Sequence, residues 1–355
     1  MADTPPLAAG HTRLGSNAGQ PMTRRDGIAK VTGTANYAAD NRPDKLLHAV
    51  YVESTIARGK VTSLDVEAAL AHPGVVHVMT PDNTPPLSHD PDDTSLPFSA
   101  KIDVLQNSNV RYAGQPIALV LAETLEAATE GARLVKAEYE TEPARIGIDG
   151  GEKFDAPYVG MGTNKAFTKG DIEAERAKAQ HTVETRIDTP LQYHNAMETH
   201  AIVATWDGDK LAVDMPNQAI GLARNGIATY FGLDPENVTL RSPFLGGGFG
   251  SKAVLHGPSV LTILAAREMK RPVKLSLKRT QMFGPVQHRS GTRQTVRIDM
   301  DADGKLCALE HTADVTTSSF DLFLDGAANS ALSLYASPAI AVSHQGIRVD
   351  TGTPG

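Results

Sequence analysis

The chain has 355 residues, of which 41% are hydrophobic and 21% charged, with 34 basic and 41 acidic side chains and a net charge of −7. This length predicts about two domains, and the composition is ordinary for a globular protein. No cluster of Lys and Arg stands out and no stretch approaches about 18 consecutive apolar residues, which excludes a typical nucleic-acid-binding protein and a membrane-spanning helix.

Residues 1–23 are polar and rich in Pro, Gly and Ala. We predict that they form a flexible arm, and they lack the apolar core of a signal peptide.

The pattern over residues 24–145 predicts a small mixed α/β domain. Gln115–Glu123 is almost continuously apolar and predicts a buried strand. Thr124 is a candidate N-cap for a helix that presents Leu125, Ala128, Ala132 and Val135 on one face. The other elements expected in this domain are strands at Leu46–Ser54, Val75–Thr80 and Lys136–Glu140, a helix at Val66–His72 ended by Pro73 and Gly74, and a loop over residues 81–101.

Residues 146–165 are rich in Gly with little periodicity and predict a crossover linker. Residues 166–355 predict a second domain of the α+β class, and we find no internal repeat. Its expected helices are Asp171–Ala179, Gln218–Phe231 and Pro258–Arg271. Its expected strands are His181–Asp188, Ala201–Trp206, Lys210–Met215, Asn237–Phe244, Pro272–Arg279 and a hairpin over Thr292–Val315 turned at residues 301–304.

Cys307 is the only cysteine. The chain therefore offers no disulfide and no cysteine set for an iron–sulfur cluster. We interpret Cys307 as a small packed hydrophobe rather than a nucleophile.

A dense glycine cluster, with four glycines in the five positions 246–250, follows the strand predicted at Asn237–Phe244. A phosphate loop of the nucleoside-triphosphatase kind is excluded, because Lys252 follows Ser251 instead of Gly and precedes Ala253 instead of Ser or Thr. Two interpretations stay open from the residues alone. The glycines permit close backbone packing at a bend, or they bring the backbone near a cofactor.

One such cofactor is a dinucleotide, because Gly248, Gly250 and Ala253 fit the pattern G-x-G-x-x-A. The strand expected next ends in Lys278 and Arg279, where the pattern requires an acidic ribose ligand. An NAD(P)-binding oxidoreductase is therefore the weaker alternative.

A second polar cluster lies at Thr189–Ala201, "TPLQYHNAMETHA", which places Gln192, His194, Glu198 and His200 within nine residues. His and Glu are common zinc ligands, but the HExxH arrangement is absent and the two histidines are six positions apart. Taken alone, this segment favours a polar turn with hydrogen-bonded histidines over a metal site.

Together, "LQYHNAMETHA" and "SPFLGGGFGSK" resemble the molybdenum-binding subunit of the xanthine dehydrogenase and aldehyde oxidase (molybdenum hydroxylase) family, bacterial aldehyde oxidoreductase type. "RRDGIAKVTGTANYAAD" resembles the opening of that subunit. Residues 24–145 are similar to its a/b hammerhead domain, and residues 166–355 to its first molybdopterin-binding domain, incomplete at the C-terminal side.

The resemblance implies oxidative hydroxylation of an aldehyde or an N-heterocycle at a molybdenum–molybdopterin cofactor, usually the cytosine dinucleotide form in bacterial members. Gln192 would hydrogen-bond an oxygen ligand of molybdenum, and the pterin dithiolene would hold the metal with no direct protein ligand. The cofactor-binding backbone implied by the family motif is Gly246, Gly247, Gly248, Phe249 and Gly250. Expected partners are an iron–sulfur subunit, an FAD subunit and the C-terminal half of the molybdenum subunit.

The sequence departs from the family pattern in two ways. Ala253 stands where purine-oxidising members have a glutamate that binds the substrate ring, which favours an aldehyde substrate. The general-base glutamate of the family lies beyond Gly355, so we assign no catalytic residue in this chain and expect it to be inactive alone. A truncated non-catalytic paralogue or binding chain is the alternative. We expect a cytoplasmic location, or a periplasmic one if the chain is exported with a partner subunit.

Overall fold

The computed structural model describes residues 21–89 and 101–355. The chain divides into two compact units, Met1–Asn36 and Tyr37–Gly355. In the first unit a short helix, α1 (Gly27–Val31), is stabilised by the ion pair of Lys30 with Asp26 at 2.7 Å. Residues 1–20 of the predicted arm and residues 90–100 of the predicted loop lie outside the described residues.

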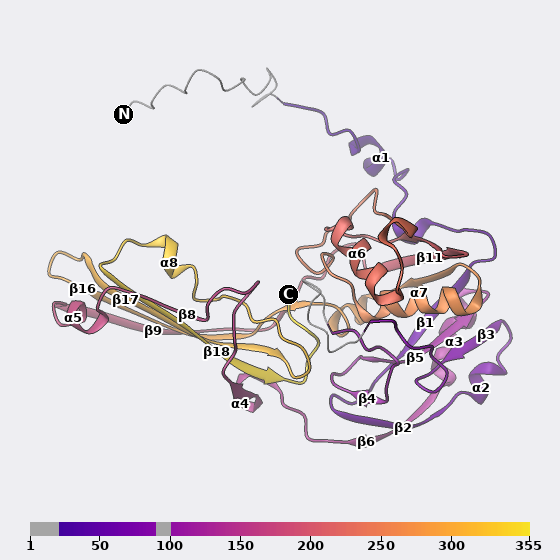
Figure 1. The fold of residues 1–355 in the computed structure, drawn as a ribbon, viewed down its shortest axis with the longest axis horizontal. Coiled ribbons are helices and arrows are strands. Elements are labelled where there is room, and N and C mark those ends of the chain that lie inside the picture. The colour runs from indigo at the N-terminus through magenta and orange to yellow at the C-terminus, as the bar shows by residue number, and fades with distance from the viewer. Residues whose placement is uncertain (1–20, 90–100) are drawn as a thin grey trace. The chain divides into compact units, whose positions relative to one another are not determined.

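The second unit contains a seven-stranded mixed sheet (Figure 1). Its order is β13 (Val238–Arg241), β12 (Lys210–Asp214), β11 (Ala201–Asp207), β14 (Val273–Ser276), β1 (Leu47–Glu53), β5 (Pro116–Ala122) and β3 (Val75–Met79). The pairing of β1 with β14 is parallel and joins strands from the two predicted domains in one sheet. All seven residues of β5 are buried, as the apolar run predicts.

Helix α3 (Leu125–Leu134) begins at the predicted cap, where Thr124 Oγ1 accepts a hydrogen bond from the Ala127 N–H at 3.1 Å. Most of the predicted face is confirmed, since Ala128 and Val135 are buried, but Leu125 is exposed and Gly131 is buried as well. A Cβ at Gly131 would lie 2.8 Å from a methyl group of Val75. The helix therefore packs closely on the sheet through small residues rather than through Leu125.

Helices α7 (Gly257–Met269) and α6 (Ile220–Phe231) pack in the same hydrophobic core as the seven-stranded sheet. Helix α7 is buried along all of Val260–Ala266, which explains why its sequence is apolar on more than one face. Helix α6 ends at Gly232, whose φ of 64° forms a left-handed C-cap.

The long C-terminal strands form a six-stranded sheet (Figure 1). Its order is β7 (Glu152–Phe154), β18 (Ala339–Val349), β17 (Leu306–Ser318), β16 (Thr292–Met300) and β9 (His181–Thr189), and β8 (Ala166–Lys169) also pairs with β18. The β16–β17 hairpin is confirmed. The sequence pattern did not predict β18, which pairs with β17 in parallel over Ala339–Val349.

The remaining elements are short. A three-stranded sheet contains β4 (Asn109–Val110), β2 (Gly59–Asp65) and β6 (Lys136–Thr141), and a two-stranded sheet contains β10 (Gln192–Tyr193) and β15 (His288–Arg289). The short helices are α2 (Glu67–Leu70), α4 (Gly147–Gly150), α5 (Ile172–Arg176) and α8 (Ala331–Leu334). Helices packed beside mixed and antiparallel sheets give the α+β class that the sequence predicts. Across the described ranges, no helix is both long and apolar enough to cross a membrane.

Candidate cofactor-binding site

The two sequence motifs lie in direct contact. The Gly246 N–H donates to Glu198 Oε2 at 2.8 Å, and the Glu198 N–H donates to the Gly246 carbonyl at 3.1 Å. A Cβ added to Gly246 would lie 2.5 Å from the Glu198 Cβ, so glycine is required for this approach. The carboxylate of Glu198 thus joins the two motifs.

Lys252 adds a second bridge between the motifs. Its side chain is fully buried, and Nζ donates to Glu198 Oε2 at 2.8 Å and to the Glu198 carbonyl at 2.9 Å. Burial lowers the pKa of Lys252, and the hydrogen bond and charge of Glu198 oppose that shift. A buried ammonium needs such compensation, so the pair fixes the two segments relative to each other.

The turn between Gln192 and Glu198 is held by Arg279. Its Nη1 donates to Asn195 Oδ1 at 2.7 Å and to the Ala196 carbonyl at 2.6 Å, and its Nη2 donates to the Met197 carbonyl at 2.7 Å. Asn195 has φ of 43°, a left-handed conformation that asparagine tolerates better than most residues. No local pattern around Arg279 indicates this contact, because its partners are more than 80 positions away in the sequence.

Gln192 lies at the start of β10, opposite Arg289 in β15. Its side chain is exposed, and no hydrogen bond to it is present among residues 21–89 and 101–355. Arg289 Nη2 donates to the Phe249 carbonyl at 3.1 Å. Gln192 is therefore the cross-strand neighbour of a residue that contacts the glycine cluster at 246–250, and its amide is free to bind a group outside the described residues.

The segment Gly246–Gly250, here called the glycine loop, has an unusual backbone. Gly247 has φ of 97°, Phe249 of 55° and Gly250 of 110°. Phe249 is the only one of these three with a side chain, and that side chain is 65% exposed. A non-glycine residue in this region is uncommon and marks a conformation imposed by its surroundings.

The hydrogen-bonding groups of the glycine loop divide into two sets. The N–H groups of Gly246 and Gly250 are satisfied by side chains, those of Glu198 and Gln218. The N–H groups of Gly247, Gly248 and Phe249 make no hydrogen bond within the part of the chain that the structure describes. Successive free N–H groups are suited to bind anionic or electron-rich groups.

The histidines of the second motif bind protein groups. His194 Nδ1 lies 3.1 Å from the Gln287 carbonyl, and His200 Nε2 lies 3.4 Å from Ser251 Oγ. Burial is the main cause that lowers the pKa of both histidines. Within the described ranges, no group of His, Cys, Asp and Glu side chains has the arrangement of a metal site.

The geometry does not support the dinucleotide interpretation. Helix α7 begins at Gly257, four positions after Ala253, so the glycine pattern does not open a helix. The strands before and after it, β13 and β14, are separated in the sheet by β12 and β11. A dinucleotide fold requires a strand that passes directly into the phosphate-binding helix of a βαβ unit.

Ala253, the residue predicted to lie in the substrate pocket, is half-buried, and its N–H donates to the Gly250 carbonyl at 2.9 Å.

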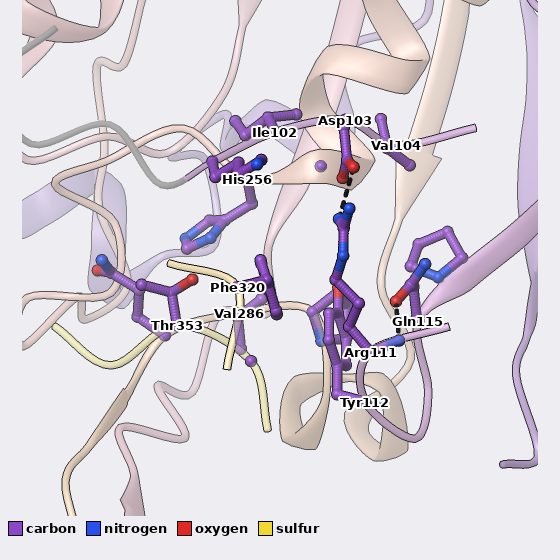
Figure 2. Close-up of a pocket in the computed structure, with 16 residues that line it drawn as sticks. Ile102, Asp103, Val104, Arg111, Tyr112, Gln115, His256, Val286, Phe320 and Thr353 are labelled. Atoms are coloured by element: carbon purple, nitrogen blue, oxygen red, sulfur yellow. Dashed lines mark hydrogen bonds and ion pairs between the residues drawn. The ribbon is translucent and has the colours of Figure 1, made fainter. Parts of the chain in front are cut away.

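A separate small cavity lies beside His256 (Figure 2). It has a volume of about 50 Å³, and its wall includes Tyr112 and the Arg111–Asp103 ion pair, which measures 2.5 Å. A drug-sized ligand needs about 300–1,000 Å³. This cavity is therefore too small for an organic substrate of that size.

Cys307 is buried in β17, and burial and nearby acidic groups raise the pKa of its thiol. A buried thiol with a raised pKa is a poor nucleophile, as expected for a packed residue.

Comparison with known proteins agrees with this arrangement. Residues 158–355 match the family "Molybdopterin cofactor-binding domain" and residues 32–143 match "Aldehyde oxidase and xanthine dehydrogenase, a/b hammerhead domain". The aldehyde oxidoreductase molybdenum-binding subunit PaoC of Escherichia coli is 36% identical over 296 residues, which cover 82% of this chain and 39% of that protein. The chain thus spans less than half the length of the curated relatives it matches.

Solved structures share the fold. Quinoline 2-oxidoreductase from Pseudomonas putida 86 superposes with a TM-score of 0.80 at 23% identity, over 94% of this chain and 45% of the other. Aldehyde oxidoreductase from Desulfovibrio gigas superposes with a TM-score of 0.76 at 25% identity, over 93% of this chain and 38% of the other. The matches to both family domains, in the same order along the sequence, identify the chain as a member of the molybdopterin-binding aldehyde oxidase and xanthine dehydrogenase family.

Proposed function

We propose that the chain is part of the molybdenum-binding subunit of an oxidoreductase that hydroxylates an aldehyde. The observation that carries the proposal is the contact between the glycine loop and the Gln192 segment through Glu198 and Lys252. This contact holds, on adjoining segments, a glutamine amide and a row of backbone N–H groups that have no partner among the described residues.

The residues present fit a molybdenum–pterin cofactor. The free N–H groups of Gly247, Gly248 and Phe249 are donors for the electron-rich atoms of such a group. Gly247 and Gly250, with positive φ, give the loop a backbone that side chains rarely permit. The exposed guanidinium of Arg289 adds a positive charge next to the loop and suits an anionic cofactor.

In this proposal the glycine loop and Gln192 hold the cofactor. When bound, the cofactor supplies the two-electron redox chemistry of the hydroxylation. The Gln192 amide donates a hydrogen bond to an oxygen atom of the cofactor without changing its charge, and so orients that atom. Glu198 is committed to Gly246 and Lys252, so it keeps the loop in place and is not assigned as the general base.

We further propose that the cofactor is the cytosine dinucleotide form and that the partners are iron–sulfur and FAD subunits. The proposed substrate is an aldehyde rather than a purine, since the Ala253 side chain offers no hydrogen bond to a ring. The modules proposed are 24–145 and 166–355, with a crossover at 146–165. A non-catalytic paralogue that binds a pterin or a partner is the second candidate.

The test is to purify the protein together with the subunits that co-purify with it, to measure molybdenum by elemental analysis, and to assay aldehydes and N-heterocycles with an artificial electron acceptor. Bound molybdenum with aldehyde turnover supports the proposal. Bound molybdenum without turnover of any substrate favours the non-catalytic paralogue. A protein that takes up no molybdenum in the presence of its partners contradicts the proposed function.

A further inference from the structure

Gln218, a residue that the sequence motifs do not include, contacts the glycine loop at Gly250 and also contacts Lys252, which follows the loop. Its Oε1 accepts hydrogen bonds from the Gly250 N–H at 3.0 Å and from the Lys252 N–H at 3.3 Å. A carbonyl oxygen has two lone pairs, so one amide can satisfy both donors. The Gln218 N–H donates to the Lys252 carbonyl at 2.8 Å, which gives a third bond to the same short segment.

The backbone of Gln218 is itself fixed at the start of α6. The neighbouring residue Asn217 is buried, donates from its N–H to Ser242 Oγ at 3.0 Å and accepts at Oδ1 from the Ala219 N–H at 2.7 Å. The Gln218 side chain thus extends from a rigid point to the loop, although the side chain itself is exposed.

The Gln218 side chain also explains why position 248 is a glycine. Gly248 is buried, and a Cβ at this position would overlap the side-chain amide of Gln218, its Oε1 first. An alanine at Gly248 would therefore push away the group that binds the Gly250 and Lys252 N–H groups. Gly248 is constrained by a neighbouring side chain of this protein, independently of any cofactor.

We propose that Gln218 is a positioning residue that sets the conformation of the glycine loop before the cofactor binds. It does so by accepting the Gly250 and Lys252 N–H groups, and it thereby leaves the N–H groups of Gly247, Gly248 and Phe249 free. The part of the inference that concerns cofactor loading rests on the proposed function. The part that concerns loop conformation does not.

The experiment compares Gln218→Met, which has a similar length but no strong acceptor, with Gln218→Glu, which keeps an acceptor oxygen for both N–H groups. Amide hydrogen exchange of Gly250 and Lys252 is measured in the cofactor-free protein. We expect exchange to become about 2- to 10-fold faster in Gln218→Met, as for loss of one net hydrogen bond, and to stay near the wild-type rate in Gln218→Glu. Equal exchange in all three proteins would overturn the proposal.

A double-mutant cycle provides a second measurement. Gly248→Ala should speed exchange of the Gly250 amide in the wild-type background and have little further effect in Gln218→Ala, where the overlapping side chain is gone. The same effect of Gly248→Ala in both backgrounds would show that another group constrains Gly248 and would contradict the inference.

Measurement of molybdenum content separates the effect of Gln218 on cofactor loading from its effect on loop conformation. Lower molybdenum in Gln218→Met, with recovery in Gln218→Glu, supports a role of the preset loop in loading. Full loading of Gln218→Met despite faster exchange overturns that role. Absence of molybdenum from the wild-type protein counts against the proposed function, and the exchange rates still decide whether Gln218 sets the loop.

Discussion

Lys252 Nζ lies 2.8 Å from Glu198 Oε2, and this fully buried lysine side chain joins two segments that are 54 positions apart in the sequence. Glu198 belongs to the motif that contains Gln192, and Lys252 follows the glycine loop. The relative position of the two motifs thus depends on an ion pair that solvent screens only weakly. The other Glu198 oxygen, Oε1, is buried and has no hydrogen-bond partner within the described residues.

We therefore expect Lys252→Met to lower the free energy of unfolding by about 3–5 kcal/mol, because it leaves the Glu198 carboxylate buried without its cation. Urea unfolding measures this change. The double variant Lys252→Met/Glu198→Gln should recover part of the loss, since no uncompensated charge remains. Lys178→Met is the matched control, because Lys178 pairs with Glu175 on the surface, and we expect no measurable change. Equal stability of the two lysine variants would contradict the role of the buried pair.

Gly246→Ala tests the close approach of the glycine loop to Glu198. The new Cβ would meet the Glu198 Cβ at 2.5 Å and the Glu198 Cα at 3.5 Å, and atoms so close to the backbone cannot move aside easily. We expect a loss of about 1–3 kcal/mol in the free energy of unfolding, as for overpacking, together with lower molybdenum content.

Gly221→Ala is the control for this substitution. Gly221 lies in α6, and among the described residues no atom outside the helix backbone and its chain neighbours lies within 4 Å of an added Cβ. Alanine there should leave stability unchanged or raise it by about 0.5–1 kcal/mol. A Gly246→Ala protein as stable as Gly221→Ala would show that the loop can separate from Glu198 at no cost.

Gln192→Ala should reduce kcat in the loaded enzyme by about 10- to 1,000-fold, because it removes one oriented hydrogen-bond donor. The melting temperature should not change, because the side chain is exposed and binds no other described residue. Steady-state kinetics with an aldehyde and thermal unfolding check the two parts. Gln180→Ala, at another exposed glutamine, serves as the control. Unchanged turnover in Gln192→Ala would mean that this residue does not contact the cofactor.

The protein should lose stability between about pH 6.5 and pH 4. Burial lowers the pKa of His256 to about 4, although the hydrogen bond to the Ser251 carbonyl partly opposes the shift. Burial and the nearby His194 likewise lower the pKa of His288 to about 4. In the unfolded chain both histidines bind a proton near pH 6.5, so the unfolded state is favoured as the pH falls through this window.

Each of these two histidines should contribute about 1.4 kcal/mol per pH unit to the decrease. Urea unfolding at pH 7, 6 and 5 measures the slope. His288→Gln should make the slope shallower by the contribution of one group, whereas His181→Gln, at an exposed position of β9, should leave it unchanged. A pH-independent stability in this window would contradict the buried, neutral state of both side chains.

Local patterns in the sequence were sufficient for most elements of the fold. The apolar run before Thr124 and the Thr124 cap gave β5 and the start of α3, because a strand buried on both faces and an N-cap depend on residues that are neighbours in the chain. The turn at residues 301–304 gave the β16–β17 hairpin for the same reason. The glycine cluster and the segment around Gln192 were also recognised as local motifs.

Long-range contacts decided the rest. No local pattern indicated that β1 would pair with β14, since the two strands are more than 200 positions apart and their pairing depends on how the predicted domains pack. The same holds for Gln218 and Arg279, which hold the two motifs through side-chain bonds to the backbone of distant residues. The sequence by itself determined which segments could approach a cofactor. Only the tertiary structure decided which N–H groups of the glycine loop stay free, because that depends on the side chains that the fold brings against it.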